Sequence, residues 1–241
     1  MVTQEQFLAV TAPATLQPVT KPVAPRHLEL RLKAKHATLS YRLQQRCKRA
    51  FDLTAAALGL LALAPSLAAL ALAVKLSSPG PVLYASKRLG RHRQPFPMFK
   101  FRSMQVGADA LRETLRQQHG QEGELFKLKD DPRVTPLGAL LRKYSLDEFP
   151  QLLNVLRGEM SLVGPRPFSP DNCRYFEPPH TLRFEATPGM TGAWQVSGRS
   201  DLGLREAAEL ELDYLMNWSL WLDAKILLQT LPAVLLKKGS F

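Results

Sequence analysis

Two adjacent carboxylates lie between two arginines that are suited to binding phosphate. Asp147 and Glu148 follow Arg142 closely, and Arg166 lies downstream in a Gly-Pro-Arg-Pro loop whose prolines restrict the backbone. A carboxylate can attack phosphorus or hold a divalent cation, and an arginine fork binds phosphate oxygens through two parallel hydrogen bonds. This combination favours phosphoryl-group transfer over cleavage of a glycosidic bond.

The acidic pair also has a purely structural interpretation. Ser145 precedes Glu148 by three positions, which is the spacing of a capping box at the start of a helix, here LDEFPQLLNVLRG. Glu148 is then partly or wholly a capping residue. Asp147 is needed for no such box, so it is the better candidate for a nucleophile.

A β-hairpin is expected to deliver further cations. Residues 82–86 and 95–104 flank Gly90 and a basic turn, which is typical of two paired strands. Strand alternation places Lys100 and Arg102 on one face, so both cations should point the same way. The alternative is that they lie on a solvated strand face. Farther along, the Gly-rich loop 188–200 offers Trp194 as an apolar or stacking platform and Arg199 as another cation.

Residues 53–74 form an uncharged, apolar run of 22 positions with Pro65 in its middle. A straight helix of that length could span the hydrocarbon core of a bilayer. Lys and Arg residues occur on both sides, so the positive-inside rule assigns both flanks to the cytoplasm, and the proline supplies the break that a re-entrant helix needs. A buried core helix kinked at proline and a straight transmembrane anchor are the alternatives.

The whole chain is expected to have an α+β, mainly helical fold. We predict three parts: a flexible N-terminal extension (1–40), a basic helix with a re-entrant membrane helix (41–78), and a cytosolic catalytic domain (79–241). The last should end in two amphipathic helices separated near 217–219. Trp218 and Trp221 in this region suit either the core or a helix in the lipid headgroup layer.

The charge balance favours a polyanionic partner. Lys and Arg exceed Asp and Glu, giving a formal net charge of +11. Nucleic acid, an anionic bilayer and a phosphorylated substrate all fit this charge, but the sequence contains no motif of a nucleic-acid-binding module. Cys47 and Cys173 match no disulfide or metal-ligand spacing and are expected to be free thiols.

Taken together, the motifs of residues 45–241 resemble the bacterial sugar transferases, also called monotopic phosphoglycosyl transferases or polyprenyl-phosphate hexose-1-phosphate transferases. Six segments occur in the family's order, which is far more specific than any one of them. They are KRAFDLTAAALGLLALAP, SSPGPVLYASKRLG, PMFKFRSM, DPRVTPLGALLRKYSLDEFPQLLNVLRGEMSLVGPRP, PGMTGAWQVSGRS and ELDYLMNWSLWLDAKILLQT.

The resemblance implies a ping-pong transfer of sugar 1-phosphate from a UDP-sugar to a polyprenyl phosphate, with release of UMP. Asp147 would be the nucleophile and would hold part of a Mg²⁺ ion, and Glu148 would orient the site or accept a proton. The phosphates would be held by Lys100, Arg102, Arg142 and Arg166. The vicinity of the nucleotide and sugar would include Trp194, Arg199 and Asp213, the last in the ELDYL motif.

The resemblance also implies a location at the cytoplasmic face of the bacterial inner membrane, in contact with anionic lipids. Family members usually carry Ser-Pro at the break of the re-entrant helix, whereas this chain has Ala64-Pro65. A homo-oligomer is compatible with the sequence, and no nucleic-acid partner is expected. The alternative function is a catalytically inactive, membrane-associated scaffold of a polysaccharide assembly complex.

Overall fold

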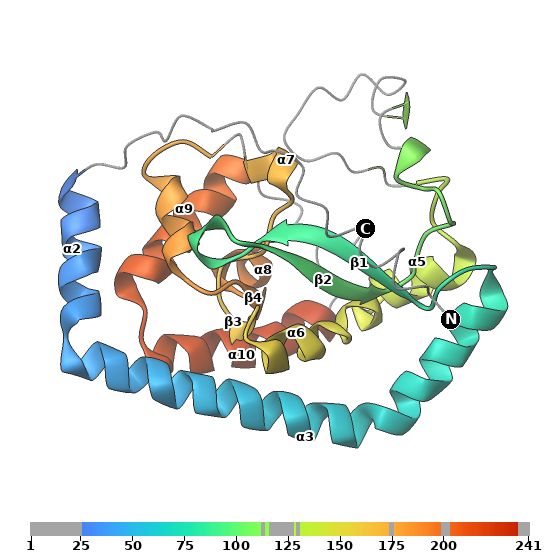
Figure 1. The fold of residues 1–241 in the computed structure, drawn as a ribbon, viewed down its shortest axis with the longest axis horizontal. Coiled ribbons are helices and arrows are strands. Elements are labelled where there is room, and N and C mark those ends of the chain that lie inside the picture. Colours follow the sequence, from blue (N-terminus) through green and yellow to red (C-terminus); the bar gives the residue numbers. More distant parts are fainter. Residues whose placement is uncertain are drawn as a thin grey trace.

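The computed structural model describes residues 26–111, 114–115, 128, 131–173, 176–198 and 203–235. A long helix, α3 (Leu39–Ser77), runs along one side of the molecule, and the other elements lie above it (Figure 1). The remaining elements are α2 (Arg26–Ala37), β1 (Leu83–Leu89), η1 (Arg91–Arg93), β2 (Pro95–Phe101), α5 (Pro136–Lys143), η2 (Leu146–Glu148), α6 (Gln151–Arg157), β3 (Ser161–Val163), α7 (Pro170–Cys173), η3 (His180–Glu185), β4 (Gly189–Thr191), α8 (Ala193–Ser197), α9 (Leu204–Asn217) and α10 (Leu220–Leu235).

Helix α3 contains the apolar run and is continuous through Pro65. Figure 1 shows it changing direction toward its C-terminal end, and a proline inside a helix removes one hydrogen bond and produces such a bend. Only 6% of its most apolar window is buried, which contradicts the alternative of a buried core helix. By length and composition α3 could cross a membrane.

The segment just before α3 is more ordered than expected. Residues 26–37, assigned from sequence to a flexible extension, form α2. Lys35 Nζ fastens this helix by donating hydrogen bonds of 3.0 Å to the carbonyl oxygens of Met216 and Trp218. Residues 1–25 of the expected extension lie outside the described part of the chain.

The predicted β-hairpin is confirmed. Strand β1 pairs antiparallel with β2, with Leu83 opposite Phe101 and Leu89 opposite Pro95. The second strand ends at Phe101, so Arg102 lies just beyond the ladder.

A second, parallel pair of strands was not expected. One of its segments lies in the Gly-rich loop 188–200, and the other directly precedes the Gly-Pro-Arg-Pro loop. Strands β3 and β4 are three residues each, too short to show alternation in the sequence. Their close approach requires glycine at position 164, since a Cβ there would lie 2.4 Å from the Thr187 carbonyl oxygen and 2.9 Å from the Gly189 nitrogen. This close contact between the two segments fixes the position of Gly164, where the loop that carries Arg166 begins.

The two predicted C-terminal helices are present as α9 and α10. The structure separates the two tryptophans that the sequence left ambiguous. Trp218 is buried in the core, whereas Trp221 is 77% exposed on α10. Only the second remains available for a lipid headgroup layer.

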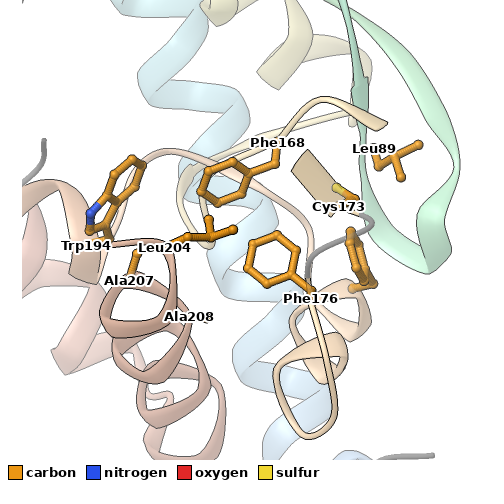
Figure 2. Close-up of a cluster of buried hydrophobic side chains, with 9 residues drawn as sticks. Leu89, Phe168, Cys173, Phe176, Trp194, Leu204, Ala207 and Ala208 are labelled. Carbon is orange, nitrogen blue, oxygen red and sulfur yellow. The ribbon is translucent and has the colours of Figure 1, made fainter. Parts of the chain in front are cut away.

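A buried cluster joins the hairpin to the C-terminal half (Figure 2). Phe168, just after the Arg166 loop, stacks on Trp194 with ring centroids 5.6 Å apart. Leu89 of β1 and Leu204 of α9 belong to the same cluster. The loop is therefore anchored by packing on its C-terminal side. Cys173, also in the cluster, is a free thiol, as is the exposed Cys47.

Candidate active site

The acidic pair lies in a 3-10 turn, η2, rather than at the start of an α-helix. Ser145 adopts a left-handed conformation (φ 55°, ψ 22°), and its side chain makes no capping hydrogen bond. A capping residue normally has an extended backbone, so the expected capping box does not form. The α-helix begins only after Pro150, at Gln151. Glu148 is therefore not engaged as a cap.

Glu148 instead forms ion pairs with two cationic side chains from distant parts of the chain. Its Oε1 accepts a hydrogen bond of 2.7 Å from Lys100 Nζ on β2 and one of 3.2 Å from Arg166 in the loop after β3. Burial alone would raise the pKa of this carboxyl, but the charges of Lys100 and Arg166 outweigh it and hold the pKa well below its usual range. Glu148 is ionised and rigidly held.

Asp147 has the opposite character. It is only 5% exposed, and its Oδ2 lies 3.8 Å from Lys100 Nζ. Within the described ranges it accepts no hydrogen bond, so its lone pairs are not committed. Burial raises the pKa of Asp147, opposed chiefly by the Lys100 charge. A partly desolvated carboxylate with uncommitted oxygens beside cations is suited to attack phosphorus or to bind a metal ion.

Arg142 approaches the pair from the last turn of α5. Its Nε donates a hydrogen bond of 2.9 Å to Ser103 Oγ, which orients the guanidinium. Burial lowers the pKa of Arg142, and the negative charge of Asp147 opposes that shift. The structure thus brings Lys100, Arg142 and Arg166 to the two carboxylates.

A buried ion pair that the sequence interpretation missed positions the backbone of Arg166. Glu211 Oε1 accepts a 2.7 Å hydrogen bond from the Arg166 amide nitrogen, and Arg183 donates to the Arg166 carbonyl oxygen. Arg183 and Glu211 also approach each other to 2.7 Å, with side chains 3% and 1% exposed. Burial raises the pKa of Glu211, while the Arg183 charge opposes this. The guanidinium of Arg166 lies 5.6 Å from the ring centroid of Trp194.

A signal for Glu211 was present in the sequence. It lies three or four positions from Ala208, Ala207, Tyr214 and Leu215, all of them buried. A carboxylate on the apolar face of a helix must be paired to be buried. Asp213, two positions farther on, is rotated away from that face; it is exposed and accepts a 2.7 Å hydrogen bond from Asn217 Nδ2.

One other candidate, Arg102, lies away from the cluster. Arg102 does not follow Lys100, as strand alternation predicted, but turns to the end of α3, where it donates to the carbonyl oxygens of Val74 (3.1 Å) and Ser78 (2.7 Å). The reason is that the last carbonyls of a helix have no partner within the helix. Arg199 lies outside the described residues.

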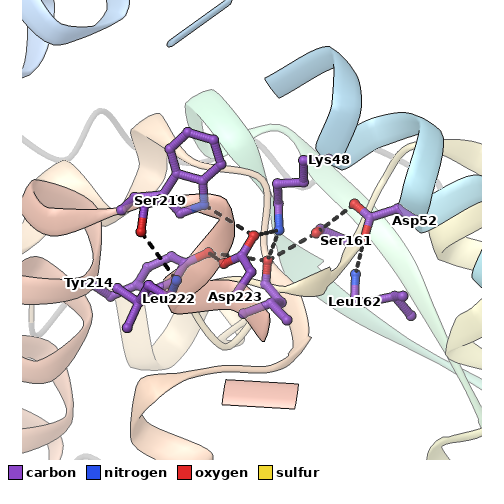
Figure 3. Close-up of polar contacts among 10 residues, drawn as sticks. Lys48, Asp52, Ser161, Leu162, Tyr214, Ser219, Leu222 and Asp223 are labelled. Carbon is purple, nitrogen blue, oxygen red and sulfur yellow. Dashed lines mark hydrogen bonds and ion pairs between the residues drawn. The ribbon is translucent and has the colours of Figure 1, made fainter. Parts of the chain in front are cut away.

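A second buried network ties α3 to the same region (Figure 3). Lys48 Nζ lies 2.5 Å from Asp223 Oδ2 of α10 and donates to the Val163 carbonyl oxygen at 2.9 Å. Asp52, one turn along α3, accepts from Ser161 Oγ at 2.7 Å. Tyr214 completes the network with a 2.8 Å hydrogen bond to Asp223. Because β3 leads directly into the Arg166 loop, α3 and the candidate site are mechanically joined.

Comparison with known proteins agrees with this arrangement. A family model described as bacterial sugar transferase matches residues 43–237, a range that contains the whole cluster. The chain belongs to the bacterial sugar transferase family. The sequence resemblance is thereby confirmed.

The sequence of this bacterial sugar transferase is similar to those of several named relatives. It is 42% identical over 198 residues to the exopolysaccharide production protein ExoY of Rhizobium meliloti (strain 1021), covering 80% of this chain and 88% of the relative. It is 42% identical over 204 residues to the UDP-glucose:undecaprenyl-phosphate glucose-1-phosphate transferase of Caulobacter vibrioides, covering 80% and 72%. The undecaprenyl-phosphate galactose phosphotransferase of Salmonella typhimurium is 41% identical over 198 residues, covering 80% of this chain but only 41% of that longer protein.

A metal ion in this sugar transferase would have to rely on few protein ligands. Among the described residues no group of three or more His, Cys, Asp or Glu side chains could hold one. Magnesium in phosphoryl-transfer sites is commonly held by one or two carboxylates together with substrate phosphates and water. The uncommitted oxygens of Asp147 fit that kind of site.

Proposed function

We propose that this chain transfers hexose 1-phosphate from a UDP-sugar to undecaprenyl phosphate, releases UMP and so starts assembly of an exopolysaccharide or O-antigen repeat. The names of the relatives support the acceptor and the type of reaction. The observation that carries the proposal is the buried, uncommitted carboxylate of Asp147 beside Lys100, Arg142 and Arg166.

In the first half-reaction a carboxylate oxygen of Asp147 attacks the phosphorus bonded to the sugar. The phosphorus–oxygen bond to UMP breaks, UMP leaves with the electron pair, and an aspartyl-phosphosugar remains on the protein. Arg166 and Arg142 bind the phosphate oxygens, where arginine forks stabilise the charge that spreads over them.

In the second half-reaction an oxygen of the polyprenyl phosphate attacks the same phosphorus. The bond to Asp147 breaks, the carboxylate is regenerated, and the lipid diphosphate sugar leaves. Glu148 is held by Lys100 and Arg166, so it keeps these cations in place and orients the site. Its lowered pKa makes it a weak base, so the acceptor phosphate attacks in its ionised form. Asp147 and the substrate phosphates would hold a magnesium ion, which would supply positive charge that neutralises phosphate oxygens.

The proposed location is the cytoplasmic face of the bacterial inner membrane, with α3 entering and leaving the same side. The exposed apolar surface of α3 supports contact with lipid: Leu61 is 74% exposed. On α10, Leu228 is 67% exposed, and Trp221 lies on the same helix. Basic residues on both flanks of the apolar run support a re-entrant path.

The decisive test uses a UDP-sugar labelled in the phosphate next to the sugar, without acceptor. Wild-type protein should retain the label and release UMP in a magnesium-dependent way, and Asp147→Asn should do neither while keeping normal yield in detergent. Asp109→Asn is the matched control, because Asp109 is exposed and contacts Tyr84 rather than the cluster. Equal label on Asp147→Asn would refute the assignment of the nucleophile. If wild-type protein turns over none of a panel of UDP-sugars, the inactive scaffold is the better explanation.

A further inference from the structure

A cavity of about 480 Å³ lies apart from the acidic pair. Its walls come from the corner where α2 meets α3, the first half of α3, the β1–β2 turn, β3 and α9. The lining includes none of the residues that surround Asp147. In Figure 1 the corner of α2 and α3 lies at the opposite end of the molecule from α5, which leads into the acidic pair. This volume is within the range of small-molecule sites.

The cavity wall is strongly basic. Its charged lining consists of Arg42, Arg46, Lys48, Arg49 and Arg91 together with two carboxylates, Asp52 and Glu185. Internal contacts already occupy the charged groups at the inner end: Lys48 pairs with Asp223, and Asp52 accepts from Ser161 (Figure 3). Arg49 donates to the Val155 carbonyl oxygen at 2.6 Å. The charged groups at the inner end of the cavity are therefore held in place by partners within the protein.

Three other arginines at the cavity differ from these internally paired groups. Within the described ranges, the guanidinium groups of Arg42, Arg46 and Arg91 donate no hydrogen bond and join no ion pair. Arg42 and Arg46 are four positions apart on one face of α3, where like charges repel. Arg91 comes from the hairpin turn, and its charge contributes, after burial, to lowering the pKa of His36 in the same wall. Two separate elements thus direct cations toward one hollow.

The aromatic side of the cavity is ordered independently. Tyr41 stacks on His36 with ring centroids 4.5 Å apart and meets the edge of Trp218 at 5.1 Å. Lys35 holds α2 against the segment that contains Trp218. These contacts order one side of the cavity in the absence of a ligand, so less conformational entropy is lost when a ligand binds.

We propose that this cavity binds a phosphate-bearing anion, at a site separate from the sugar-nucleotide site. Arginine forks suit phosphate oxygens, and no ion pair within the described ranges engages the three arginines. The apolar run begins at Leu53, directly after Asp52 of the cavity lining. The cavity thus lies at the point where α3 would enter a membrane, so the phosphate of an anionic lipid headgroup is the favoured source over a soluble phosphate ester.

The test compares ligand binding by the full chain in detergent micelles. The variant Arg42→Gln/Arg46→Gln/Arg91→Gln removes the three charges, and Arg31→Gln/Lys33→Gln removes two exposed charges of α2 outside the cavity. The probes are phosphatidylglycerol, phosphatidylcholine, whose choline neutralises the phosphate, and soluble glycerol 3-phosphate, with binding measured by calorimetry. We expect saturable binding of phosphatidylglycerol that stays unchanged in the control. In the triple variant it should weaken about tenfold, because three exposed ion pairs to the phosphate are lost.

The three probes identify the source of the phosphate. Binding of phosphatidylglycerol but not of glycerol 3-phosphate supports the site with a lipid as its ligand. Equal affinity for both supports it with a soluble ester as the ligand. Equal binding of phosphatidylglycerol by wild type and the triple variant, with both proteins folded by circular dichroism, overturns the inference. Since binding rather than turnover is measured, either result leaves the proposed reaction to its own test.

Discussion

Replacing Lys100 with methionine should move the acidic limb of the pH–rate profile to higher pH. In the proposed reaction Asp147 attacks only when it is ionised, so the limb should follow the pKa of Asp147, which burial raises. Lys100 is the largest opposing influence, with its Nζ 3.8 Å from Asp147 Oδ2. Removing a cation removes an interaction that favours the charged carboxylate, so the pKa rises further.

The size of the shift follows from the geometry. Two unit charges about 4 Å apart interact by roughly 4 kcal/mol at an effective dielectric constant of about 20, and one pKa unit corresponds to about 1.4 kcal/mol. Observed shifts from such neighbours are about 1–3 units. The Lys100 ammonium also serves Glu148 at 2.7 Å, so the lower end of that range is expected. Glu148→Gln should move the limb the opposite way, because it removes a like charge beside Asp147.

The assay is the rate of UMP release in the first half-reaction, in single turnover, across the acidic range. Lys100→Met will also reduce the maximum rate if Lys100 contacts phosphate, so the position of the limb is fitted separately from its height. Arg205→Gln is the control, since the Arg205 side chain is 86% exposed and pairs only with Glu209 among the described residues. A limb that stays in place in Lys100→Met, or moves to lower pH, would refute the electrostatic coupling of Lys100 to Asp147.

Three further predictions test other parts of the structure. Arg166→Lys should lose most of its kcat/KM for the UDP-sugar despite keeping its charge, because an ammonium cannot form the bidentate fork; near-normal turnover would mean that the fork is not used. Glu211→Gln leaves the buried Arg183 without its ion pair, which should lower the free energy of unfolding by about 3–5 kcal/mol and the Tm by roughly 6–20 °C. The control Glu209→Gln removes an exposed ion pair and should lower the Tm by less than about 2 °C. Equal Tm shifts would contradict the buried-pair argument. Single cysteines at Ser40 and Ser86, with both native cysteines replaced, should resist an impermeant thiol reagent in intact cells and react after the membrane is opened; labelling of only the first from outside would indicate a spanning helix.

The sequence by itself determined the features that depend on local order. The period-two pattern around Gly90 predicted the hairpin, and the uncharged run predicted the long exposed helix α3. The ordered motifs identified the family, and the acidic pair with Arg166 identified the centre of the candidate site. Each of these signals lies within a few dozen neighbouring residues, where propensity and spacing are informative.

Only the tertiary structure decided which groups meet. The capping box at Ser145 was a sound local expectation, but the left-handed turn directs Glu148 to Lys100, which is 48 positions away. In the same way, carbonyl oxygens at the C-terminal end of α3 have no partner within the helix. Arg102 donates hydrogen bonds to them and so leaves the strand face that alternation assigned to it. Side-chain pairing depends on distance in space and on which buried charges lack partners, and neither quantity is encoded in the spacing of residues along the chain. The ion pair of Arg183 with Glu211, which positions Arg166, could therefore be located only once α9 and η3 were packed together.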